Sequence, residues 1–137
     1  MIAWRRKQEG QVLVMSALVM AFLFLPLSIF VIDTALIESA YAQLGETLQA
    51  SAEDGASSID ETVYRTSNGK TVVLDAARAK TVADRSMVAS AIPGLKSWTV
   101  SVQGLRVSVT ATMKVDLLIL GSATLTESRA ASLVYGQ

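Results

Sequence analysis

Hydrophobic residues are concentrated in one uninterrupted block near the start of the chain. Residues 12–32 read VLVMSALVMAFLFLPLSIFVI and contain no charged side chain. At 1.5 Å per residue, roughly 21 helical residues extend about 31 Å, which matches the hydrocarbon core of a bilayer. The pattern therefore predicts a transmembrane helix over residues 11–32. Pro26 lies inside it and predicts a kink, because proline lacks the N–H that the helix needs at that position.

The helical period continues beyond the apolar block. Apolar residues recur every three or four positions, and polar residues lie between them, until the Ser-Asn-Gly turn signal at residues 67–69. We therefore expect one helix from about Gln11 to about Thr62, with residues 33–66 forming a helical stalk outside the membrane. The apolar stripe of this stalk comprises Ile37, Tyr41, Leu44, Leu48, Ala52, Ala56 and Ile59.

Residues 67–137 predict a small α+β head domain. Asp75 is a suitable N-cap for a second helix that ends before Pro93. The period then changes to two, with alternating strands over residues 98–102 and 107–115 joined by a tight turn at Gln103-Gly104. A further strand is expected to begin near Ala123 and to reappear around residues 131–135. Helices followed by antiparallel strands indicate an α+β fold, with a helix against one face of the sheet.

The charges that flank the apolar block predict the orientation of the chain. Basic residues stand at positions 5–7, whereas Asp33 directly follows the block. The positive-inside rule therefore predicts that the chain crosses the cell membrane (the inner membrane) once. Residues 1–10 would form a cytoplasmic tail, and the C-terminal domain would be extracytoplasmic. A cleavable signal peptide is the alternative, because Ala-Tyr-Ala at residues 40–42 has the form of a cleavage site.

Acidic residues dominate the stalk. No Lys or Arg occurs between Lys7 and Arg65. One interpretation is a solvated face, and the other is a docking surface for a basic partner. Identical acidic stalks packed side by side would repel one another unless a neighbour or a cation neutralised them, which favours a minor or mixed-assembly subunit over an abundant homopolymer. The candidate docking residues are Glu38, Glu46, Glu53 and Asp54.

The composition argues against an enzyme. The chain has no Cys and no His, which removes thiolate metal sites and the usual general base near neutral pH. Lys80 is not spaced to stack beside Ser86 or Ser90, and the pairs Glu53-Asp54 and Asp60-Glu61 lack the ligand alternation of a calcium loop. Its 12 basic and 12 acidic residues leave no net charge to attract nucleic acid. We therefore expect no catalytic residue, cofactor, metal or small-molecule substrate.

Several short motifs along the chain carry a resemblance to a known family. They are Gly10-Gln11-Val12 at the start of the membrane helix, Leu25-Pro26 within it, Asp33 at its outer end, Leu48-Gln49-x-x-Ala52-Glu53 with Ala56, Trp98-Thr-Val-Ser-Val, Arg106-Val-Ser-Val-Thr and Ser128-Arg-Ala-Ala-Ser-Leu-Val. Together they span nearly the full chain. This layout resembles the TadE/TadG-like proteins of tight-adherence (type IVc) pilus systems.

The resemblance implies a minor pilin or pseudopilin that initiates, caps or assists a thin adhesive filament. Its partners would be the membrane, other pilin or pseudopilin subunits and the pilus assembly machinery. Prepilin processing would cut between Gly10 and Gln11, but position 15, where processed pilins carry Glu, is Met15. The alternative is a permanently anchored scaffold or binding module that presents its outer domain to a partner.

Overall fold

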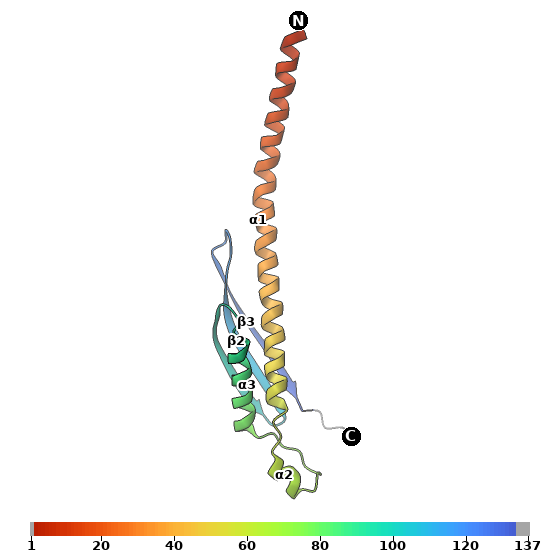
Figure 1. Cartoon of the computed structure of the whole chain (residues 1–137), viewed down its shortest axis with the longest axis vertical. Coiled ribbons are helices and arrows are strands. Elements are labelled where there is room, and N and C mark those ends of the chain that lie inside the picture. Colours follow the sequence, from red (N-terminus) through yellow and green to blue (C-terminus); the bar gives the residue numbers. More distant parts are fainter. Residues whose placement is uncertain (1, 134–137) are drawn as a thin grey trace.

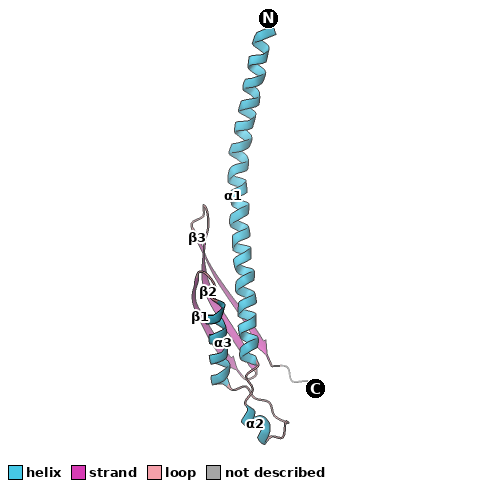
Figure 2. Ribbon diagram, in the orientation of Figure 1, coloured by secondary structure: helices cyan, strands magenta, loops and turns pink. Residues whose placement is uncertain are grey.

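The structure is a computed structural model that describes the backbone of residues 2–133 and the side chains of residues 10–133. Within these residues the fold is α+β, with one long helix, shorter helices and a three-stranded antiparallel sheet (Figures 1 and 2). The predicted fold class is therefore confirmed. In chain order the elements are α1 (Ile2–Ala56), α2 (Glu61–Thr66), α3 (Ala76–Ser90), β1 (Leu95–Gln103), β2 (Arg106–Asp116) and β3 (Ser122–Ser132).

Helix α1 ends earlier than the sequence predicted. It runs for 55 residues and stops at Ala56 rather than near Thr62. The cause is Asp60, whose carboxylate accepts hydrogen bonds from the backbone N–H of Thr62 at 2.9 Å and of Val63 at 3.1 Å. These bonds make Asp60 the N-cap of α2, so it starts a new helix instead of lying in the interior of α1. The prediction of one helix to Thr62 is wrong for this reason.

The segment that contains α2 is closed at its base by backbone pairing. Ile59 and Leu74 form an isolated antiparallel bridge. On either side of it, the Asp60 N–H donates to the Val73 carbonyl at 2.9 Å, and the Asp75 N–H donates to the Ser58 carbonyl at 3.0 Å. The chain thus leaves α1, forms α2 and returns to the same place to begin α3.

Helix α3 has the ends that the sequence predicted. The Asp75 carboxylate accepts a hydrogen bond from the Arg78 backbone N–H at 3.0 Å, which confirms Asp75 as the N-cap. At the other end Ala91 is left-handed, with φ 45°, just before Pro93. The Trp98 indole N–H donates to Asp84 at 3.0 Å and links α3 to β1.

The three strands form a meander in the order β1-β2-β3. Gln103 pairs with Arg106, so the β1–β2 turn contains only Gly104 and Leu105. The predicted tight turn is present, but it lies one residue later than the predicted Gln103-Gly104. Strand β3 is continuous from Ser122 to Ser132, whereas two separate stretches were expected. The end of the expected second stretch, residues 134–135, lies outside the described residues. The strands alternate between an apolar face and a polar face.

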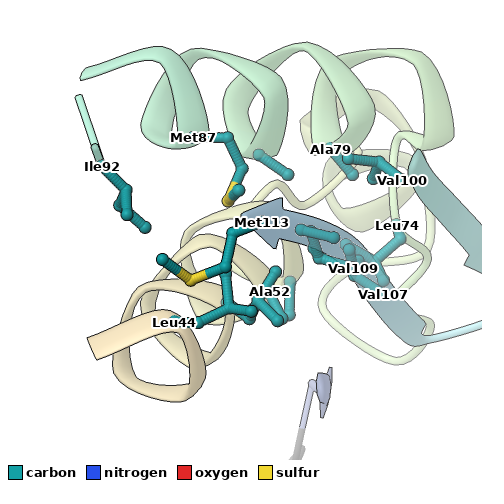
Figure 3. Packing of buried hydrophobic residues seen from close by; sticks show 14 residues of the cluster. Leu44, Ala52, Leu74, Ala79, Met87, Ile92, Val100, Val107, Val109 and Met113 are labelled. Atoms are coloured by element: carbon teal, nitrogen blue, oxygen red, sulfur yellow. The ribbon is translucent and has the colours of Figure 1, made fainter. Parts of the chain in front are cut away.

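Both α1 and α3 pack on the apolar face of the sheet, and the core lies between these layers (Figure 3). The last four turns of α1 therefore belong to the core of the head, although the sequence predicted residues 33–66 as a separate stalk. The apolar stripe that was predicted for this stalk is instead the face of α1 that packs against the sheet. The fully buried side chains include Leu44, Leu48, Met87, Val107 and Val109.

Gly55 permits the close approach of these layers. A Cβ atom placed on Gly55 would lie 3.0 Å from the Ala79 carbonyl oxygen, 3.1 Å from a Val107 methyl carbon and 3.2 Å from the Ala83 Cβ. α3 can therefore cross α1 at a separation that a larger residue would prevent. The sequence alone does not indicate this packing role of Gly55.

Candidate functional site

The part of α1 from residue 10 to residue 28 is not covered by the rest of the described chain. Residues 10–28 are exposed throughout. Among the described residues, α1 is the one helix long and apolar enough to span a membrane. In Figure 1 it projects away from the head as a single, gently curved rod. The fold thus pairs a compact α+β head with one uncovered apolar helix compatible with a single membrane span.

α1 continues through Pro26 without a break. Two hydroxyl groups near it bond within the helix: Ser28 donates to the Phe24 carbonyl at 2.8 Å, and Thr34 donates to the Phe30 carbonyl at 2.9 Å. Such bonds satisfy hydroxyl groups in a setting where water is absent. The hydroxyl groups of Ser28 and Thr34 are therefore compatible with lipid around them.

The predicted processing site lies inside this exposed part of α1. Gly10 and Gln11 are both exposed and helical, and nothing lies within 4 Å of the position that a Cβ on Gly10 would occupy. Met15 is also exposed, at 62% of its full area. The structure therefore leaves this segment accessible but brings no other described part of the chain to it.

The acidic docking residues do not all share one environment. Glu38, Glu46, Glu53 and Asp54 are exposed. Glu46 and Glu53 line a shallow groove together with Gln49, which donates to Glu53 at 2.7 Å. Asp54 instead accepts a hydrogen bond from the Ser86 hydroxyl at 2.7 Å and so ties α1 to α3.

Arg129 borders the same groove and changes its charge. It lines the groove beside Glu46 and Glu53. It also forms an ion pair with Glu127, whose side chain is only 8% exposed. Gly45 makes room for this pair, because a Cβ there would lie 3.2 Å from both Glu127 carboxylate oxygens. The groove is thus acidic along α1 and has a cation at its β3 edge, a neighbour that the sequence did not indicate.

The other polar pairs considered in the sequence have local partners. Ser86 is bonded to Asp54, and Lys80 is exposed. Asp60 caps α2, and Glu61 forms a surface ion pair with Arg65 at 3.3 Å. Within the described part of the chain, no group of three or more Asp, Glu, Cys or His side chains is placed to hold a metal ion.

Asp33 is the residue whose position the sequence did not explain. It is 1% exposed. Its carboxylate accepts hydrogen bonds from the backbone N–H of Leu118 at 2.8 Å and of Ile119 at 3.3 Å. These residues belong to the loop between β2 and β3, so Asp33 fastens the tip of this hairpin to α1.

The sequence itself contains a signal for this contact. Asp33 lies on the same helical stripe as Ile37, Leu44 and Leu48, at spacings of four, seven and four residues, so it faces the head rather than solvent. The loop sequence Leu-Leu-Ile-Leu at residues 117–120 is also unusual, because turns are normally polar. Together they point to a buried carboxylate beside an apolar loop.

Comparisons with protein-family models, with curated proteins and with solved structures give no match to this chain.

Proposed function

We propose that this chain is a structural or assembly subunit, a minor pilin or pseudopilin, of a tight-adherence-like (type IVc) pilus. The observation that carries the proposal is the division of α1 into two halves. Residues 10–28 are apolar and exposed, whereas Leu44, Leu48 and Ala52 fill the core of the head. A subunit of this design is held in the bilayer by one half of its helix while the other half is fixed to its outer domain.

The exposed half of α1 has two environments open to it. Lipid covers it in the membrane, and equivalent helices would cover it in the core of a filament. Ala17, Ala21 and Ser28 are small and exposed, which permits close contact between such helices. The resemblance to the TadE/TadG-like proteins favours this second use.

The proposed orientation follows from the flanking charges. The basic residues at positions 5–7 place the N-terminus in the cytoplasm, and the head then lies outside the inner membrane. The acidic groove on α1 faces the same compartment as the head. The proposed partners are therefore the membrane, other pilin or pseudopilin subunits and the assembly machinery.

A second function is favoured by one residue. Met15 stands where processed pilins carry Glu, which favours an uncleaved chain that remains in the membrane. In that case the protein is an anchored scaffold or binding module whose head recruits a partner. The two functions differ in the mass and the location of the mature chain.

The test is the intact mass of the native protein in the membrane fraction and in sheared surface filaments. A chain that begins at Gln11 and is present in filaments supports the processed subunit. A full-length chain confined to membranes contradicts the filament role and supports the scaffold. A chain that begins at Gln43 contradicts both, because residues 40–42 would then be a signal-peptide site.

Two matched variants sharpen this measurement. Gly10→Leu changes the residue at the proposed cut, and Gln8→Leu makes the same change two positions earlier. If the chain is processed after Gly10, Gly10→Leu leaves it full length while Gln8→Leu is still cleaved. If both variants and the native chain each have the full-length mass that their own sequence gives, no processing occurs at this site.

A further inference from the structure

The loop between β2 and β3 carries an apolar patch at the tip of the hairpin. Leu118, Ile119 and Leu120 are 65%, 62% and 62% exposed. Leu117 and Gly121 flank these residues directly, and the polar residues Asp116 and Ser122 follow on either side. Consecutive exposed aliphatic side chains at a turn are unfavourable in water, so a patch of this kind indicates a contact with another apolar phase.

The position of this patch is fixed relative to α1. The two hydrogen bonds from Leu118 and Ile119 to Asp33 hold the loop beside the outer end of the apolar block. Figure 1 shows the hairpin rising beside α1 beyond the rest of the head, toward the N-terminal half of the helix. On α1 itself, Phe30 and Ile32 next to Asp33 are 61% and 46% exposed. Exposed apolar side chains of the loop and of the helix therefore occur close to the same contact, that of Asp33 with the loop.

We propose that Leu118, Ile119 and Leu120 insert into the outer interfacial layer of the membrane, as a second contact with lipid beside α1. This proposal rests on the membrane placement of α1 in the proposed function. The occupant is lipid because the patch adjoins the segment that would already be in lipid. It is also a projecting tip, and a projecting tip of aliphatic residues suits a fluid layer that closes around it.

The hydrogen bonds of the loop provide an independent argument. A loop that enters an apolar layer must satisfy its backbone N–H groups without water, because each unsatisfied group is costly there. The Leu118 and Ile119 N–H groups donate to Asp33, and the Leu117 N–H donates to the Gly121 carbonyl at 2.8 Å. Three successive N–H groups of the loop, those of Leu117, Leu118 and Ile119, are thus bonded within the protein.

The same contact explains how an acidic side chain is placed directly after the apolar block. A carboxylate at the edge of the bilayer is unfavourable unless polar groups surround it. The loop covers Asp33 and supplies N–H donors to both of its oxygens. Asp33 accepts the N–H groups of the loop, and the loop covers the carboxylate of Asp33, so both can lie at the membrane boundary. The resulting second contact fixes the tilt of the head against the membrane surface.

The test measures the depth of single labels in lipid. The chain has no cysteine, so the variants Ile119→Cys, Leu18→Cys and Ala77→Cys each carry one label site. Ala77 is exposed at the start of α3 and serves as the control on the head. Each full-length variant is placed in lipid nanodiscs, labelled with an environment-sensitive fluorophore and exposed to lipids that carry a nitroxide quencher at a shallow or a deep position.

The three labels separate the two proposals. We expect the label at position 18 to be quenched most strongly by the deep nitroxide. The label at position 119 should be quenched by the shallow nitroxide, several-fold more than the label at position 77. The label at position 77 should be quenched by neither nitroxide to a significant extent. If Leu18 is not quenched, the membrane placement itself is wrong. If Leu18 is quenched but Ile119 behaves like Ala77, the lipid contact of the loop is overturned while the membrane placement stands. If Ile119 is instead shielded from both lipid-borne and water-soluble quenchers, a protein covers the loop and the proposal is also overturned.

Discussion

The carboxylate of Asp33 accepts hydrogen bonds from the backbone of Leu118 and Ile119, although Leu118 lies 85 residues further along the chain. This contact joins the outer end of the apolar half of α1 to the tip of the β2–β3 hairpin. The core packing of α1, α3 and the sheet lies further along the helix. Asp33 therefore determines the position of the hairpin tip, while the buried residues determine the fold of the head.

The Asp33→Ala variant is expected to release the hairpin tip without unfolding the head. The backbone N–H groups of Leu118 and Ile119 lose their acceptor, at a cost of about 1–3 kcal/mol. Amide exchange of the segment 117–121, measured by mass spectrometry on the full chain in nanodiscs, should become roughly tenfold faster, since 1.4 kcal/mol corresponds to a factor of ten.

The matched control for this change is Asp33→Asn, which keeps one side-chain oxygen as an acceptor. Its exchange rate in the hairpin loop should lie between those of the native chain and of Asp33→Ala. Exchange in β1 should be the same in all three proteins. Unchanged exchange of the loop in Asp33→Ala would show that Asp33 does not hold it.

The Gly55→Leu variant is expected to destabilise the head. The added side chain meets the Ala79 carbonyl and Val107, where even a Cβ would lie 3.0–3.1 Å away. Overpacking of this kind costs about 1–3 kcal/mol, which exceeds the gain of up to about 1 kcal/mol in helix propensity. Denaturant unfolding in detergent, followed by the fluorescence of Trp98 in a Trp4→Phe background, measures the loss.

Ala50→Leu is the control for this prediction because Ala50 is exposed on the same helix. Its free energy of unfolding should stay within about 0.5 kcal/mol of the native value. If Gly55→Leu is as stable as Ala50→Leu, the close crossing of α1 and α3 does not limit the size of residue 55.

The sequence predicted the elements of the head well because their signals are local. Asp75 caps α3, and the Gln-Gly pair marks the β1–β2 turn, since each depends on a few neighbouring residues. The end of α1 was not predicted because the local sequence is compatible with Asp60 either as an exposed residue inside a helix or as an N-cap. Only the return of the chain, with Ile59 paired to Leu74, makes it a cap.

The candidate site was less predictable because it depends on contacts between distant segments. The sequence showed the acidic residues of α1, but not Arg129 beside Glu46 and Glu53. The placement of Asp33 against Leu118 likewise requires the sheet to be folded onto α1. Helical periodicity identified the apolar stripe correctly, but it cannot say whether a stripe faces a partner or the same chain.

The Asp84→Ala variant is expected to weaken the link between α3 and β1. The Trp98 indole N–H would lose its acceptor, which lies 3.0 Å away in the native chain. Leaving a half-buried donor without a partner costs about 1–3 kcal/mol. The double variant Asp84→Ala, Trp98→Phe should lose less stability than the sum of the single variants, and a thermodynamic cycle gives the coupling energy. A coupling near zero would show that this hydrogen bond does not stabilise the head.

Neutralising the groove on α1 tests the docking interpretation of its acidic residues. In the Glu46→Gln, Glu53→Gln double variant both carboxylates become neutral, while Arg129 remains at the edge of the groove. Both residues are exposed, so the free energy of unfolding should change by no more than about 0.5 kcal/mol. If the groove binds a basic partner, the amount of this chain in sheared filaments should fall several-fold while the amount in the membrane is unchanged.

Glu61→Gln, which neutralises an exposed carboxylate on α2 away from the groove, should assemble like the native chain. Normal assembly of the double variant would instead identify the acidic residues as a solvated face.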